Sequence, residues 1–274
     1  MPNKISSFYI DTLFTLISTS GLFIAFIVTL YLLQRLTCGV AAKQFGGRSI
    51  YISAIVGTPV HEISHALLCF PFFHKISEVA LFKPDGSGTL GYVIHSYNPT
   101  NIWQQIGNFF IGVAPLLGGT AAIYLFTYWF LPYGENVISV IDSLSAQFRH
   151  TSGFTTFLSA LYEAVIQLVS VLWVIAQHSP GKFALWTYLT AAIALHMSPS
   201  PADLKGSFKG GVILVLVIGC IRFLSDDAWE SLLEHLASGL LSLSITYSIC
   251  IVLAGSLALV IFALSLICLR RSRS

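Results

Sequence analysis

The sequence predicts an all-α polytopic membrane protein with six or seven transmembrane segments and one small β-hairpin. Apolar residues make up 55% of the 274 residues and charged residues only 9%, far below the roughly 25% charged content of a soluble domain. The mean hydropathy is +0.79, and uncharged stretches of the roughly 20 residues needed to cross a bilayer recur along the chain. We therefore expect an integral, multi-pass protein of a plasma or inner membrane, surrounded by the lipid bilayer.

Seven apolar segments are candidates for these crossings. The stronger ones are Thr12–Gln34, Ile50–Phe73, Ile106–Leu131 and Leu236–Leu269, and the weaker ones are Phe154–Ile175, Phe183–Met197 and Gly211–Ile221. The first is too long for a signal peptide and lacks a small-residue cleavage site, so we expect an uncleaved anchor. No repeat or low-complexity linker divides the chain, which predicts a single membrane domain over residues 1–274.

Charge and cysteine usage exclude several classes of protein. The net charge is only +2, and the chain has no basic patch interleaved with aromatic residues, so no nucleic-acid partner is expected. The cysteines are scattered, mostly in apolar surroundings, and form no CxxC pair. We expect them to be small core residues and neither metal ligands nor disulfides. They are Cys38, Cys69, Cys220, Cys250 and Cys268.

The longest polar stretch, Lys75–Gln105, predicts the β-hairpin. Ile76–Phe82 and Thr89–His95 are rich in β-prone residues, and the six residues between them, Lys83–Gly88, are typical of a turn. A hairpin offers strand edges to which an extended peptide can pair. We expect His95 to finish the hairpin or to line a cleft, and His74 to lie at a segment end near the membrane interface.

The most informative motif is His61-Glu62-Ile63-Ser64-His65, inside the apolar segment Ile50–Phe73. Positions i and i+4 share one face of a helix, so both imidazoles can reach one metal ion while Glu62 stands beside it. This is the HExxH pattern of zinc sites in which the glutamate is the general base. Ionisable groups inside a membrane segment are expensive and mark functional sites. The motif therefore predicts Zn²⁺ bound by His61 and His65, with Glu62 as the catalytic residue.

The order of motifs over roughly residues 50–210 resembles the site-2 protease (M50-type) intramembrane zinc metalloproteases. The resemblance rests on HEISH in an apolar helix, the hairpin after it, Gly112-Val113-Ala114-Pro115-Leu116-Leu117-Gly118-Gly119, and the segment from Ser198 to Gly206 with its Pro-Ala-Asp sequence. It implies a zinc endopeptidase that cuts membrane-embedded protein substrates. It also implies that Asp203 is the third metal ligand.

The residues themselves leave the third ligand open. Asp203 can instead be a helix cap between Pro201 and Lys205, because aspartate is a favoured capping residue. Glu163 is its strongest rival, since a carboxylate at membrane depth needs a partner. His178 and His196 are further possible ligands. Seven crossings would make the His61 and Asp203 helices antiparallel, whereas six would make them parallel, as the resemblance implies.

Two other functions are compatible with these residues. A metal or proton transporter or channel could use the HExxH helix as a polar pathway, and a catalytically silent zinc-binding membrane protein could regulate a partner. The presence of Glu62 argues against the silent protein, because a structural zinc site has no need of a base.

Overall fold

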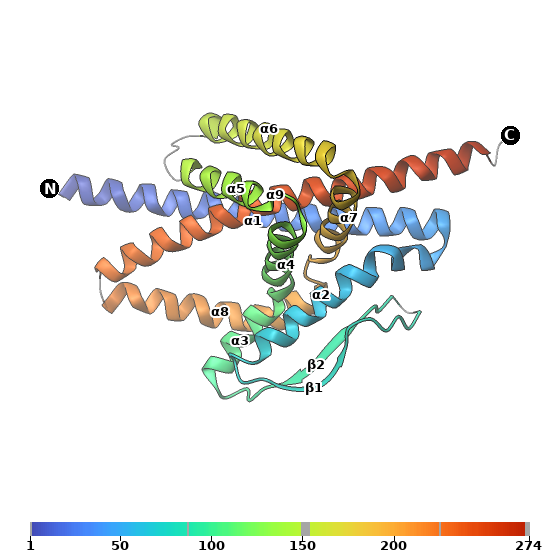
Figure 1. Ribbon diagram of the computed structural model, residues 1–274. Helices are drawn as coiled ribbons and strands as arrows, with labels where there is room; N and C mark the ends of the chain where they lie inside the picture. The colour runs from blue at the N-terminus through green and yellow to red at the C-terminus, as the bar shows by residue number, and fades with distance from the viewer. Residues whose placement is uncertain (1, 87, 149–153, 225, 272–274) are drawn as a thin grey trace. The chain divides into compact units, whose positions relative to one another are not determined.

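The computed structural model describes residues 2–86, 88–148, 154–224 and 226–271, which form helices and one small sheet (Figure 1). The α-helices are α1 (Pro2–Phe45), α2 (Tyr51–Cys69), α3 (Ile102–Gly112), α4 (Ala114–Phe130), α5 (Gly134–Phe148), α6 (Phe154–His178), α7 (Pro180–His196), α8 (Pro201–Leu224) and α9 (Asp226–Arg271). A 3-10 helix, Gly47–Ile50, precedes α2. The predicted class, mostly helical with one small hairpin, is confirmed.

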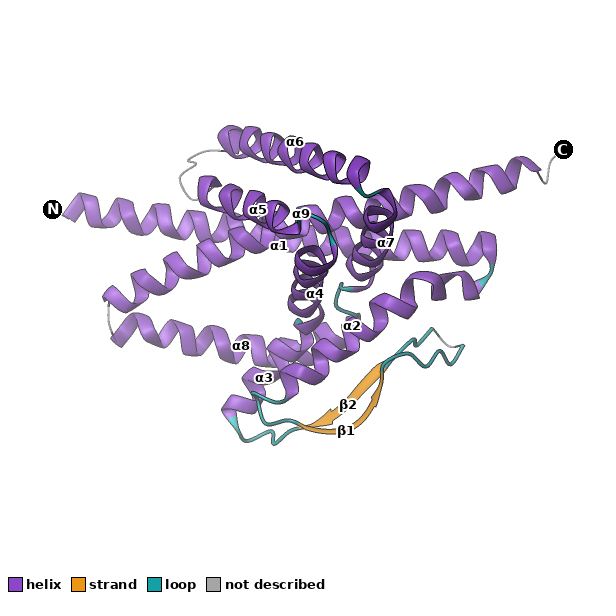
Figure 2. Ribbon diagram, in the orientation of Figure 1, coloured by secondary structure: helices purple, strands orange, loops and turns teal. Residues whose placement is uncertain are grey.

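The hairpin consists of β1 (Lys75–Ala80) and β2 (Tyr92–Ser96), which pair antiparallel as the sequence predicted (Figure 2). Lys75 pairs with Ser96 and Ala80 with Tyr92. A bulge lies between Ile76 and Glu78. Both strands pack along α2, so the sheet lies beside the helix that carries the HExxH motif.

Two of the described helices contain a stretch long and apolar enough to cross a membrane, Phe23–Phe45 and Thr246–Ser265. A third crossing is formed if α3 and α4, which meet at a bend of 55°, count as one broken span. This bent pair corresponds to the predicted segment Ile106–Leu131. The described part of the chain therefore carries two or three apolar spans by length and composition.

The chain folds into two compact units. One comprises Thr29–Tyr124, Thr187–Ile218 and the chain from Cys250 onward. The other comprises the residues before Thr29 together with Leu125–Trp186 and Gly219–Ile249. The HExxH motif, the hairpin and Asp203 all belong to the first unit.

Glycines allow the helices of the first unit to approach closely. A side chain on Gly57 of α2 would collide with the Cβ of His196, 2.6 Å away, and one on Gly112 of α3 would meet the backbone oxygen of Asp203 at 2.6 Å. Gly118 of α4 lies directly against Ser64 of α2. Small residues permit such packing between apolar helices. These contacts bring the ends of α3, α7 and α8 up to the middle of α2.

Candidate metal centre

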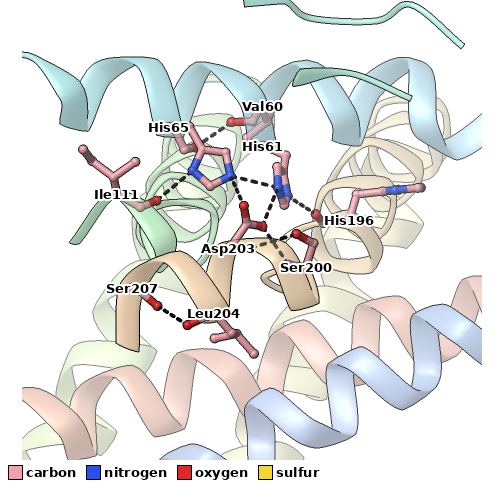
Figure 3. Close-up of polar contacts among 10 residues, drawn as sticks. Val60, His61, His65, Ile111, His196, Ser200, Asp203, Leu204 and Ser207 are labelled. Carbon is pink, nitrogen blue, oxygen red and sulfur yellow. Dashed lines mark hydrogen bonds and ion pairs between the residues drawn. The ribbon is translucent and has the colours of Figure 1, made fainter. Parts of the chain in front are cut away.

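His61 and His65 project from one face of α2 and meet Asp203 from the first turn of α8 (Figure 3). The Nε2 atoms of the two imidazoles are 3.1 Å apart. Asp203 Oδ2 lies 3.6 Å from His61 Nε2, and Asp203 Oδ1 lies 3.4 Å from His65 Nε2. The three residues are thus arranged so that they could hold a metal ion.

Hydrogen bonds to backbone carbonyls fix the orientation of both imidazoles. His61 Nδ1 donates to the carbonyl oxygen of His196 at 2.8 Å, and His65 Nδ1 donates to that of Ile111 at 2.7 Å. In a neutral ring a protonated Nδ1 leaves Nε2 with a free lone pair. A hydrogen bond from the second ring nitrogen of a metal-binding histidine orients the ring and raises its basicity. Both histidines therefore present Nε2 as the ligand atom.

Each of these carbonyls is available because a helix is interrupted. In a continuous helix the carbonyl of Ile111 would accept from the N–H of residue 115, but Pro115 has no N–H. His196 is the last residue of α7, and the last carbonyls of a helix have no partner within it. Pro115 and the end of α7 thus leave these two carbonyls available to accept from the histidines.

A capping box holds Asp203. The backbone N–H of Ser200 donates to Asp203 Oδ2 at 2.7 Å, and the backbone N–H of Asp203 donates to Ser200 Oγ at 3.2 Å. Pro201 takes the first helical position of α8, for which its fixed φ is suited. The two predicted roles of Asp203, helix cap and metal ligand, are therefore compatible, because the same carboxylate caps α8 and faces both histidines.

Charge and spacing at this site fit a cation. With Nδ1 of each ring donating to a backbone carbonyl, Nε2 of His61 and of His65 carries a lone pair. Two imidazole lone pairs then converge on a carboxylate. Tetrahedral Zn²⁺ with ligand bonds of about 2.0–2.1 Å would place its ligand atoms about 3.3–3.4 Å apart. The separations of 3.1, 3.4 and 3.6 Å lie around that value.

The same three residues line a cavity of about 870 Å³. Glu62, a residue that is only 7% exposed, lines this cavity. Its wall also includes the segment from Gly88 to Val93, which leads into β2, and Tyr31 and Arg35 of α1. A Cβ on Gly91 would lie 2.9 Å from Glu62 Cγ. The chain entering β2 thus packs directly over the HExxH glutamate.

Of the alternative third ligands, His196 lies in the same compact unit as the cluster, whereas Glu163 and His178 belong to the other unit. The imidazole Nε2 of His196 is paired with Ser53 Oγ at 3.0 Å, so His196 contributes its carbonyl and not its ring. Glu163 is exposed on α6, and His178 has its ring against Tyr133. Among the described residues, neither Glu163 nor His178 belongs to a group with metal-ligand spacing.

A second group with metal-ligand spacing, Cys69, His74 and His95, escaped the sequence analysis. His74, expected near an interface, is buried, and Cys69 is buried beside it. Burial, with the nearby His74 and His65, holds the pKa of His95 below its ordinary value. The spacing Cys-x4-His from Cys69 to His74 was the available signal, but His95 joins them only through the hairpin.

Comparisons with protein-family models, curated proteins and solved structures find no match to this chain.

Proposed function

We propose that this protein is a zinc-dependent intramembrane endopeptidase. The observation that carries the proposal is the convergence of His61, His65 and Asp203, with Glu62 at the same cavity. Two imidazoles and one carboxylate, with one position left open, form a ligand set of catalytic zinc sites. The motif order that resembles site-2 proteases supports the same activity.

Zn²⁺ at such a site supplies a Lewis acid that polarises an amide carbonyl and lowers the pKa of water. The chain supplies the proton transfers. The Glu62 carboxylate takes a proton from the attacking water and passes it to the amide nitrogen of the leaving peptide, as a general base and then a general acid. His61 and His65 keep their Nδ1 protons on the carbonyls of His196 and Ile111, which prevents either ring from turning away.

The cavity and the hairpin support an extended substrate. A helical amide is hydrogen-bonded within its own helix, so a membrane-spanning substrate must unwind before its carbonyl can be attacked. The sheet has only two strands among the described residues, so β2 has one edge without a strand partner. The residues leading into β2 line the cavity, and an unwound segment that pairs there lies next to Glu62.

The apolar spans support a membrane setting for this chemistry. We propose that the protein crosses the membrane six times, because this number makes α2 and the helix of Asp203 parallel, as the resemblance implies. The broken α3–α4 pair and helix α2 are then part of the membrane domain. Non-helical backbone at that depth is tolerated where protein buries it or where it lines a cavity.

Replacing Glu62 with glutamine tests the proposal. Glu62→Gln keeps the size and the hydrogen-bonding groups of the side chain but cannot accept the proton. We expect the full-length protein in liposomes to keep its zinc and to lose about 10²–10⁴-fold in the rate of cleavage of a co-reconstituted single-span reporter polypeptide.

Cleavage is read as fragments by mass spectrometry, and zinc by elemental analysis of the same sample. Glu163→Gln is the matched control, because it makes the same chemical change on an exposed position of α6. Undiminished cleavage by the Glu62→Gln variant would exclude Glu62 as the base. A parent protein that cuts no reporter but moves Zn²⁺ or protons across the liposome would favour a transporter.

A further inference from the structure

The second cluster lies where α2 turns into the hairpin. Cys69 is the last residue of α2, His74 precedes β1, and His95 lies in β2. One ligand atom from each residue lies within 4.8 Å of the others. The Cys69 side chain is fully buried and His74 is only 7% exposed. Three potential ligands from three successive segments therefore converge in one interior position.

The end of α2 is built to bring His74 back over Cys69. The backbone N–H of His74 donates to the carbonyl of Cys69 at 3.0 Å, and that of Phe73 donates to the carbonyl of Phe70 at 3.1 Å. This pair of bonds is a Schellman motif, with Phe73 at the left-handed position at φ 56°. Glycine is the usual residue there, and strained non-glycine residues cluster at functional sites.

The ring of His74 is held in the tautomer that binds metals through Nδ1. Its Nε2 donates to the carbonyl oxygen of Gln104 at 2.8 Å, so Nδ1 carries a lone pair. Nδ1 faces Nδ1 of His95 at 3.0 Å. The ring of Tyr97 stacks on that of His74, with centroids 5.2 Å apart. A histidine that donates its second N–H to a backbone carbonyl is the usual arrangement behind a metal ligand.

We propose that Cys69, His74 and His95 form a second metal site, which takes Zn²⁺ or an ion of similar softness. One thiolate and two imidazoles suit such ions and do not suit Mg²⁺ or Ca²⁺, which prefer oxygen. His95 lines the 870 Å³ cavity, which gives the ion a route to the site and leaves room for water as the fourth ligand. The ion ties β2 and the start of β1 to the end of α2.

Cobalt distinguishes the two sites without any measurement of peptidase activity. Only the second site contains sulfur, so only there does bound Co²⁺ give an intense near-ultraviolet thiolate-to-metal charge-transfer band. We expect the full-length protein loaded with Co²⁺ to bind about two ions per chain and to show this band. Cys69→Ser should remove the band and lower the stoichiometry to about one ion.

Three further variants make the result decisive. Cys250→Ser is the matched control, because Cys250 is also fully buried and lies outside both clusters; it should keep the band and both ions. Asp203→Asn should keep the band while the first site weakens. His95→Ala, a change at a half-buried position, should lose the band, and a retained first-site cobalt spectrum shows that the variant is folded.

A parent protein without the charge-transfer band, or a band that survives Cys69→Ser, overturns the second site. Because the readout is a cobalt–sulfur band, the second site can fail while peptidase activity stands, and the reverse also holds.

Discussion

The two histidine clusters begin on the same helix, α2, but differ in the charge and surroundings of their third residue. At the first, a carboxylate joins two imidazoles, and Glu62 and an open cavity adjoin it. At the second, a buried thiol joins two imidazoles beside the hairpin. A hard oxygen ligand next to a base and an open cavity suits hydrolysis, whereas a buried sulfur ligand suits a structural ion. One helix can thus carry a reactive and a structural position about one turn apart, at His65 and Cys69.

The largest effect is expected from removing a ligand of the first cluster. His65→Ala takes away both a ligand and the hydrogen bond to Ile111, so the first site should lose its zinc and cleavage should fall below detection. Elemental analysis should still find about one zinc per chain, held by the second cluster. Retention of two zinc ions would show that His65 is not a ligand.

Asp203→Asn should have the next largest effect. The amide keeps the size of the side chain but loses the charge that balances the cation. We expect the Kd for zinc at the first site, measured by competition with a chelator, to rise by more than about 100-fold. Loss of a group that only hydrogen-bonds to a metal ligand weakens metal binding by roughly 10–100-fold. Glu163→Gln should leave it unchanged. The opposite pattern would move the third ligand to Glu163.

A smaller effect is expected from Pro115→Ala, which touches neither cluster directly. Alanine restores an N–H that can donate to the carbonyl of Ile111 and so competes with His65 Nδ1. We expect about a 10–100-fold weaker first site, because the ring loses its fixed tautomer and orientation. The charge-transfer band of the second cluster is the internal control and should not change. Unaltered zinc affinity would refute the role given to the free carbonyl.

The smallest effect should come from Ser200→Ala. It removes the hydroxyl that accepts from the N–H of Asp203, and loss of such a cap lowers stability by about 0.5–2 kcal/mol. Asp203 Oδ2 still accepts from the backbone N–H of residue 200, so zinc binding should change less than in the Pro115→Ala variant. Chemical denaturation and chelator competition on the same sample separate the two quantities. An affinity loss as large as that of Asp203→Asn would mean that the hydroxyl itself is a ligand.

Local spacing predicted one part of the site and tertiary contacts determined the rest. His61 and His65 converge because they are four residues apart on a helix, and this spacing can be seen in the sequence. Asp203 lies 138 residues beyond His65, and its own surroundings favoured a cap as much as a ligand. Close packing at Gly112 places the first turn of α8 against the end of α3.

The second cluster and the carbonyl acceptors could not be predicted for a related reason. Cys69 looked like a core residue because apolar neighbours surround it, and its link to His95 depends on the hairpin register. The segment Ile106–Leu131 was expected to be one span, but α3 ends at Gly112, before Pro115. What the sequence did not reveal is that the carbonyl freed by such a break has a histidine as its new partner.

The position of Asp203 in the first turn of α8 affects how firmly a cation is held. The amino end of a helix carries about half a positive charge, and at this site it points toward the same carboxylate that faces the two imidazoles. The positive end of the helix and a bound cation would therefore both interact with this one carboxylate. The interaction with the helix would weaken the interaction between the carboxylate and the cation by about 0.3–1 kcal/mol. We therefore expect an ion at this site to bind a few-fold less tightly than it would to the same three side chains elsewhere, and to exchange correspondingly faster.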